Sequence, residues 1–297
     1  MNPQRPMSLP GQPRAVGGRR VASWRHAAGW GRAILLVAAV IICVLPLAWT
    51  ALASFRILPD TTQWPPRWSP PSLDNYTGEL GVAEPTFTQE LLTSAALSLA
   101  TAGLTVAVAF LAAYALTRSR FRGRGLVVQA SLILASLPVM AYIIPLGESM
   151  RRAKLEDTFV GLLLAQTAVL APLAVYVLQG YLAQLPVELE EAAALEGASA
   201  WQVLGQVALP LAAPGLAATG LILFVLSWNQ FLVPLVLTTS QIKTIPVAMS
   251  DFFTFERELE WPTAAAALIV SLLPLAALVT IAHGVLERFA LAPAENH

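Results

Sequence analysis

Long runs of apolar residues, separated by shorter polar segments, make up most of the chain after its first 32 residues. A helix that crosses a bilayer needs about 20 consecutive apolar residues. Six segments meet this requirement, and they lie at 33–55, 91–117, 126–147, 158–180, 214–237 and 261–286. None of the six contains Asp, Glu, Lys or Arg. The pattern therefore predicts an all-α membrane protein with six transmembrane helices.

The fifth span lies within a longer uncharged run, 197–242, whose 46 residues are too many for one crossing. As a single helix it would extend about 69 Å, whereas the hydrocarbon core is about 30 Å thick. Proline lacks an amide donor and clashes with the preceding turn, so Pro210 and Pro214 are predicted to break the helix before the fifth span.

Composition supports a bilayer as the solvent of this chain. Hydrophobic residues make up 56% and charged residues 12%, against about 25% charge in an average soluble domain. That pattern argues against a soluble enzyme, and a formal net charge of zero gives no field that would attract nucleic acid. One cysteine, Cys43, and three histidines provide no spacing typical of a metal site. We expect no catalytic residue, no cofactor and no bound metal.

Arginines near the helix ends set the expected orientation. Residues 1–32 hold six arginines and residues 118–125 hold four, and both segments lie on the same side when there are six spans. The positive-inside rule makes this side the cytoplasm. Residues 1–32 are therefore interpreted as a basic, disordered cytoplasmic tail, and 287–297 as a second cytoplasmic tail.

The segment 186–210 is also cytoplasmic in this arrangement. Its four glutamates cannot lie in lipid, and they are interpreted as part of an exposed loop: Glu188, Glu190, Glu191 and Glu196. Pro186 followed by acids is typical of a helix start, and Gly197 can end that helix. A second short helix over about 198–206 would carry Trp201. Such a helix either inserts into a groove on another protein or lies flat on the membrane.

The chain lacks the chemistry of a self-sufficient pump. A phosphate-binding loop needs Gly-Lys followed by Ser or Thr, and neither Lys154 nor Lys243 follows a glycine. Any ATP hydrolysis is therefore expected in a partner. The absence of ionisable residues from the spans argues against an ion-coupled secondary transporter, although backbone carbonyls can also bind sodium. This alternative and that of a non-transport membrane assembly subunit stay open.

The segment Glu191-Ala192-Ala193, with Gly197 and then Val207-x-Leu209-Pro210, resembles the EAA loop of binding-protein-dependent ABC importer permeases. Valine stands where the family usually has isoleucine. Other segments resemble the carbohydrate branch, specifically the second permease subunit of maltose-type importers: Leu73-Asp74-Asn75-Tyr76, Ala113-Tyr114-Ala115-Leu116-x-Arg118, Leu155-x-Asp157-Thr158 and Ser227-Trp228-Asn229-x-Phe231. Gln230 and Thr93 depart from the family pattern.

The resemblance implies a type I ABC importer permease in the bacterial inner membrane. It implies as partners a second, homologous permease subunit, two cytoplasmic ATPase subunits, an extracytoplasmic sugar-binding protein and membrane lipid. The EAA segment would form the coupling helix that docks on the ATPase, through Glu191, Ala192, Ala193, Gly197, Trp201 and Pro210. Asn229 and Gln230 are expected either to line the pathway or to hydrogen-bond neighbouring helices.

Overall fold

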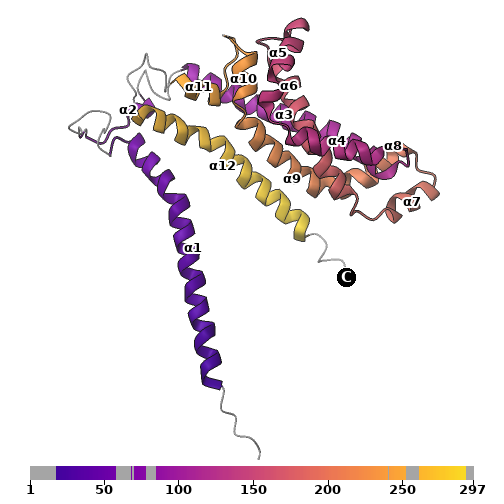
Figure 1. The fold of residues 1–297 in the computed structure, drawn as a ribbon, viewed down its shortest axis with the longest axis horizontal. Helices are drawn as coiled ribbons and strands as arrows, with labels where there is room; N and C mark the ends of the chain where they lie inside the picture. The colour runs from indigo at the N-terminus through magenta and orange to yellow at the C-terminus, as the bar shows by residue number, and fades with distance from the viewer. Residues whose placement is uncertain are drawn as a thin grey trace, which may run out of the picture. The chain divides into compact units, whose positions relative to one another are not determined.

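The computed structural model describes residues 18–57, 68, 70–77, 85–239, 241–251 and 261–291, and every regular element in them is helical (Figure 1). The long helices are α1 (Gly18–Ser54), α3 (Pro85–Arg118), α6 (Phe159–Leu182), α9 (Leu209–Trp228) and α12 (Trp261–Leu291). Shorter ones are α2 (Asp74–Thr77), α4 (Arg124–Ser136), η1 (Val139–Ala141), α5 (Ile143–Arg152), α7 (Glu188–Leu195), α8 (Ala200–Gln202), η2 (Val203–Ala208), α10 (Leu232–Leu237) and α11 (Ile245–Asp251). The all-α prediction is confirmed for these residues.

The chain divides into two units, residues 1–50 and 51–297. In the first unit the described part is a single helix, the portion of α1 from Gly18 to Thr50. Helix α1 begins at Gly18, inside the segment 1–32 that was expected to be a disordered tail, and residues 1–17 lie outside the described part. Arginine and alanine are strong helix formers, and extending an existing helix requires no new nucleation. The C-terminal tail is likewise helical as far as Leu291.

Within the part of the chain that the structure describes, five helices are long and apolar enough to cross a membrane. They are Leu35–Ser54, Thr86–Arg118, Phe159–Leu182, Ala200–Trp228 and Trp261–Ile281. These match the first, second, fourth, fifth and sixth segments expected from the sequence, with shifted boundaries for the fifth.

The third predicted segment, 126–147, is not one continuous helix. Helix α4 ends at Ser136, the 3-10 turn η1 follows, and α5 begins at Ile143. Pro138 has extended backbone angles, φ −65° and ψ 133°, and Leu137 before it is also extended. Proline disfavours helical geometry in the preceding residue and lacks an amide donor, so the apolar run bends here.

The fifth segment also differs from expectation, because Pro210 and Pro214 do not break it. Helix α8, the π-helical turn η2 and α9 continue one another from Ala200 to Trp228. The π-helical turn bonds residues five apart and is wider than an α-helical turn, which makes room for the ring of Pro210. The break comes instead at Asn229–Phe231, and α10 starts at Leu232.

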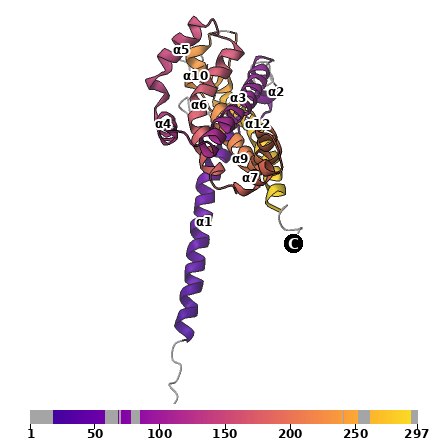
Figure 2. The same ribbon diagram turned by 90° about the vertical axis from the view of Figure 1, so that its right-hand side faces the viewer.

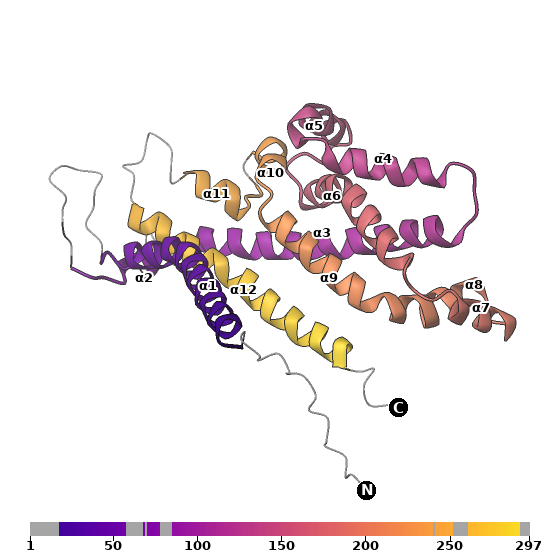
Figure 3. The same ribbon diagram turned by 60° about the horizontal axis from the view of Figure 1, so that its bottom comes forward.

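The core of the second unit is formed by α3, α6 and α9 packing on one another. Alanines with no exposed surface lie at these contacts and allow the helices to approach closely: Ala109, Ala113, Ala174 and Ala212. Helices α4 and α12 lie on opposite sides of this core (Figures 2 and 3). Helices α7 and α8 lie at one end of the unit, and α2 and α11 at the other (Figure 3).

Candidate functional site

Helix α7 and the turn after it are built by local sequence signals. Glu188, Glu190 and Glu191 occupy the first turn, where acids interact favourably with the helix dipole. At the other end Gly197 has φ +95°. Its amide donates to the Ala194 carbonyl, and the amide of Ala198 donates to the Ala193 carbonyl, each at 3.1 Å. This pair of bonds is the Schellman arrangement, so the expected helix stop at Gly197 is confirmed.

The next helix, α8, begins at Ala200, and its cap residue Ser199 lies two residues after Gly197. The Ser199 side chain accepts from the Gln202 amide and the Gln202 side chain accepts from the Ser199 amide, which together form a capping box. The short spacing between the Gly197 stop and the Ser199 start makes a compact elbow. We call residues Glu188–Gln202 the elbow below. Helix α7 and helix α8 both pack against η2, the turn that follows the elbow.

The elbow exposes large apolar side chains. Leu195 is 89% exposed and Trp201 is 77% exposed. Leu189 is also exposed, as are Glu191, Ala192 and Pro210, whereas Ala193 is half-buried. A short helical segment that presents leucine and tryptophan outward, away from the α3–α6–α9 core, has the features of a helix that fits a groove on a partner. The predicted coupling residues therefore lie together, except for Pro210 further along in α9.

Glu190 differs from its neighbours, because its side chain turns inward and is 8% exposed. Its Oε1 accepts from Arg118 Nε at 3.0 Å and from Arg118 Nη2 at 2.8 Å. Its Oε2 accepts from the Tyr114 hydroxyl at 3.0 Å. These contacts fasten the start of α7 to the end of α3.

Sequence reasoning grouped Glu190 with the exposed glutamates and did not find this contact. The partners of Glu190 lie 72 and 76 residues earlier in the chain, and nothing in the local pattern of the loop indicates them. The available signal was the resemblance of the segment 113–118 to the family, which already singled out Tyr114 and Arg118.

The second predicted group, Asn229 and Gln230, lies at the break between α9 and α10. The Asn229 side chain donates to the Val225 carbonyl at 2.8 Å. The backbone N–H of Gln230 donates to the Ser227 carbonyl at 3.1 Å. Both bonds satisfy carbonyls at the end of α9 itself. The Asn229 side chain thus bonds within its own helix, and the two residues lie far along that helix from the elbow.

A buried polar network lies beside this break. Gln166 on α6 is 1% exposed, and its side-chain oxygen accepts from the hydroxyls of Ser227 at 2.5 Å and Thr101 at 3.4 Å. Three helices, α3, α6 and α9, thus share one amide group. Hydrogen bonds of this kind hold helices together where lipid provides no hydrophobic drive for association.

Asp157 forms a second anchor, in the connection between α5 and α6. Its Oδ2 accepts from the Thr239 hydroxyl at 2.8 Å and from the Gln241 amide at 3.0 Å, and its Oδ1 accepts from the Ile242 amide at 3.3 Å. Its own amide donates to the Leu237 carbonyl at 2.9 Å. The segment after α10 is thereby tied to the start of α6.

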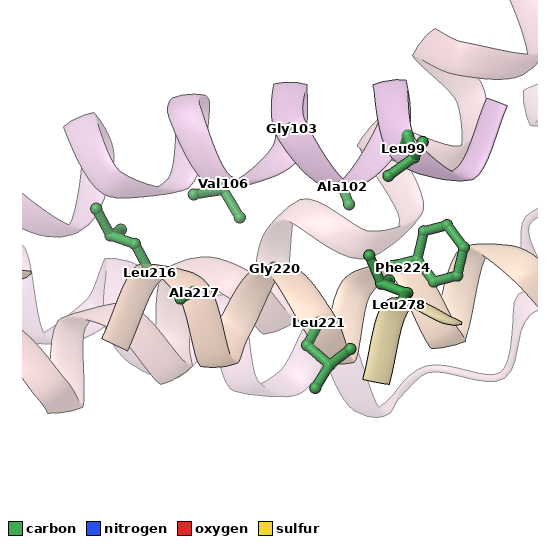
Figure 4. Close-up of a pocket in the computed structure, with 10 residues that line it drawn as sticks. All are labelled: Leu99, Ala102, Gly103, Val106, Leu216, Ala217, Gly220, Leu221, Phe224 and Leu278. Atoms are coloured by element: carbon green, nitrogen blue, oxygen red, sulfur yellow. The ribbon is translucent and has the colours of Figure 1, made fainter. Parts of the chain in front are cut away.

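An apolar pocket of about 370 Å³ lies between α3 and α9 (Figure 4). Leu99, Ala102 and Val106 line it from α3, and Leu216, Gly220 and Phe224 from α9. These walls offer no side-chain hydrogen bonds, so the pocket does not suit a polar ligand. Among the described residues, no group of three His, Cys, Asp or Glu side chains could hold a metal ion.

Comparison with known proteins gives consistent matches over most of the chain. A family model described as binding-protein-dependent transport system inner membrane component matches residues 105–290. The chain is 32% identical over 271 residues to a trehalose transport system permease protein of Mycobacterium tuberculosis, covering 90% of this chain and 94% of that protein. It is 32% identical over 248 residues to a trehalose/maltose transport system permease protein of Thermococcus litoralis, covering 82% and 89%.

Solved structures give the same picture of the fold. A chain of a bacterial ABC transporter involved in the import of the acidic polysaccharide alginate matches with a TM-score of 0.69 at 21% identity, covering 95% of this chain and 99% of that one. A second alginate transporter structure, in complex with an alginate pentasaccharide-bound periplasmic protein, matches with a TM-score of 0.66 at 14% identity, covering 90% and 98%.

Proposed function

The chain belongs to the family of binding-protein-dependent transport system inner membrane components, and we propose that it is the second permease subunit of an ATP-driven sugar importer. The fold shared with the alginate transporter chain confirms the expected fold class, that of a type I ABC importer permease. The family makes the chain a multi-pass inner-membrane protein and a transport subunit. The proposal adds that both termini are cytoplasmic and that partner subunits carry out ATP hydrolysis.

The elbow is the observation that carries the coupling part of the proposal. It presents Leu195 and Trp201 outward, beside exposed acids of α7, at one end of the second unit (Figure 3). In the proposal this face seats in a groove on a cytoplasmic ATPase. Ala192 and Ala193 allow close packing, Trp201 fills the groove, and Gly197 fixes the angle between the two arms.

A continuous helix connects the elbow to the fifth membrane span, so movement of the elbow would be transmitted into the membrane. Helix α8, η2 and α9 form one helix from Ala200 to Trp228, with Pro210 and Pro214 within it rather than at a break. ATP-driven closure of two ATPases would move the elbow as a rigid lever. The lever would then tilt α9 and alternate the access of the pathway between the two faces of the membrane.

The substrate class is inferred from relatives whose names specify sugars. Two of them are permeases for trehalose and for trehalose or maltose, and the solved alginate transporter includes a periplasmic protein that carries a pentasaccharide. We infer a di- or oligosaccharide, or a sugar derivative, delivered by an extracytoplasmic binding protein to this chain and a homologous permease subunit.

Asn229 and Gln230 remain candidates for lining the pathway. They lie at the break of the fifth span between α9 and α10, and such breaks in membrane proteins occur where the backbone is buried in protein or lines a water-filled cavity. The bond from Asn229 to the Val225 carbonyl supports the alternative role of stabilising the end of α9. The resemblance also implies that most sugar contacts lie in the partner permease.

The proposal is tested by purifying the tagged chain from its native membranes in mild detergent. We expect an ATP-binding cassette ATPase and a second permease to copurify, and ATP to drive uptake of trehalose, maltose or a larger oligosaccharide when the complex is reconstituted with its binding protein. Uptake that survives ATP depletion but collapses with a protonophore would instead favour ion coupling. Absence of any copurifying ATPase would favour a membrane assembly subunit.

A further inference from the structure

The contact between Glu190, Arg118 and Tyr114 links the elbow to a helix that is not its neighbour in the chain. Helix α7 is joined by short connections to α6 before it and to α8 after it. Helix α3, by contrast, ends 70 residues before α7 begins, at Arg118. We propose that these three residues form a lock through which α3, and not the α8–α9 helix alone, moves with the elbow.

The geometry of the lock is specific. Arg118 directs two N–H groups to one oxygen of Glu190, and Tyr114 donates to the other oxygen. The two charged side chains are 16% and 8% exposed. A carboxylate withdrawn from water is stable only when its partners are in place. The lock therefore holds one relative position of α7 and α3 and resists sliding between them.

The neighbouring glutamates show that burial is particular to position 190. Glu188 and Glu191 lie in the same helical turn and are exposed. They carry the same favourable interaction with the helix dipole, and among the described residues neither forms a side-chain hydrogen bond or ion pair with α3. The inward direction of Glu190 thus adds a contact with α3, and the start of α7 does not require this contact for its own stability.

Helix α3 has a second polar attachment toward its other end. The Ser94 hydroxyl accepts from the Ile245 amide at 2.7 Å, at the start of α11. Ser94 and Arg118 are separated by about 36 Å of helix at 1.5 Å per residue. Helix α3 is thus a rod fastened to the elbow at one end of the unit and to α11 at the other (Figure 3).

This arrangement defines the role of the lock, and it rests on the proposed function. Displacement of the elbow by the ATPase would push or pull α3 along its axis through Glu190. The rod would carry that displacement to α11, at the end of the unit that the proposed orientation places outside the cytoplasm. Glu190, Arg118 and Tyr114 are therefore positioning residues for coupling, and they touch neither ATP nor sugar.

The test compares variants in the assembled complex, reconstituted in proteoliposomes with its binding protein and sugar. Glu190→Gln and Tyr114→Phe weaken the lock, and Glu188→Gln is the matched control in the same turn. We expect Glu190→Gln to keep basal ATP hydrolysis while sugar transported per ATP falls about tenfold, because the neutral amide removes the ion pair with Arg118 and one of the two acceptor oxygens. Tyr114→Phe should lower the ratio less than Glu190→Gln does. Glu188→Gln should also lower it less, because it removes a charge from the docking face and leaves the contacts of Glu190 with Arg118 and Tyr114 in place.

A charge exchange separates coupling from folding. Arg118→Glu alone should uncouple transport, and combining it with Glu190→Arg should restore part of the sugar transported per ATP. The proposal is overturned if Glu190→Gln matches Glu188→Gln, if the exchange restores nothing, or if uptake falls only in proportion to the loss of assembled complex. Failure of the proposed function would show differently, as a wild-type chain that binds no ATPase or shows no ATP-driven uptake.

Discussion

Gly197 joins the two arms of the elbow through a backbone conformation that other residues avoid. Its φ of +95° places it in the left-handed region, which costs an L-residue roughly 1–2 kcal/mol. Space is not the limitation, because a Cβ at Gly197 would meet no atom within 4 Å. The requirement for glycine here is thus one of backbone angle.

Replacement of Gly197 by leucine is predicted to open the Schellman turn and change the angle between α7 and α8. Sugar uptake in membranes with verified subunit levels should fall strongly, because the elbow would no longer match its groove. Gly205→Ala is the matched control, since Gly205 lies in η2 without a positive φ and a Cβ there also meets nothing within 4 Å. Unimpaired uptake by Gly197→Leu would count against the lever.

Asp157 is the second residue with a sharp local prediction. It accepts three hydrogen bonds from the segment 239–242, so Asp157→Ala leaves the amides of Gln241 and Ile242 without this acceptor. Hydrogen–deuterium exchange at these two amides should accelerate, while exchange within α3 should not change. Glu156→Gln is the control, because Glu156 pairs with Arg151 at 3.7 Å on the surface. Equal exchange in both variants would contradict the anchoring role.

At this scale the sequence predicts residues whose signal is local. Gly197 is identified by its place after an acidic helix start and before an apolar segment, and its role depends on its own backbone angles. Glu190 could not be identified in this way, because its burial depends on Arg118 and Tyr114 in another helix. A charge pattern gives the cost of burying an acid, but it does not show where a distant partner will lie.

At the scale of elements, the packing of α6 on α9 depends on Gly215. A Cβ at this position would lie 2.4 Å from the Cδ1 and Cε1 atoms of the Tyr181 ring. Gly215→Ala is therefore predicted to separate the two helices or displace the ring, at a cost of about 1–3 kcal/mol for overpacking. The unfolding temperature of the purified complex should fall.

Two further variants define the cause of that loss. Gly220→Ala should be tolerated, because the nearest atom to a Cβ there is Val106 Cγ2 at an ordinary 3.6 Å. Gly215→Ala combined with Tyr181→Ala should recover part of the stability relative to the sum of the single changes. If both glycine variants unfold alike, the contact with Tyr181 is not what limits the packing.

Proline was the weakest guide to where elements end. Pro46, Pro172, Pro214 and Pro274 all lie inside helices, because neighbouring helices in a membrane protein re-satisfy the freed backbone groups. Pro138 does end a helix, whereas the fifth span breaks without a proline, at Asn229. Hydrophobic length located the spans, but the breaks depend on packing and on local hydrogen bonds such as that of Asn229 to Val225.

At the scale of the whole chain, its apolar exterior defines the environment it needs. Leucine, isoleucine and valine side chains between 35 and 47 are more than half exposed, and so are Leu126, Ile133 and Ile144. Apolar surface of this extent requires lipid or partner subunits. The sequence predicted this requirement correctly from composition, and a subunit in a larger membrane assembly satisfies it.

The orientation of the chain is the last prediction, and the coupling proposal depends on it. The elbow must face the cytoplasm, as the arginines at 118–124 indicate under the positive-inside rule. Cys43 is the single cysteine, so a Cys43→Ser background allows one new cysteine to be placed at a time. Ala200 in the elbow, Arg120 after α3 and Ala153 after α5 are all exposed, which makes them suitable positions.

In intact cells or spheroplasts, a membrane-impermeant maleimide added outside should label Ala153→Cys and leave Ala200→Cys and Arg120→Cys unmodified. The pattern should reverse in inside-out vesicles, which controls for intrinsic reactivity. External labelling of Ala200→Cys together with protection of Ala153→Cys would place the elbow outside the cell. An ATPase in the cytoplasm could not then reach it, and neither the lever at Gly197 nor the lock at Glu190 could act as proposed.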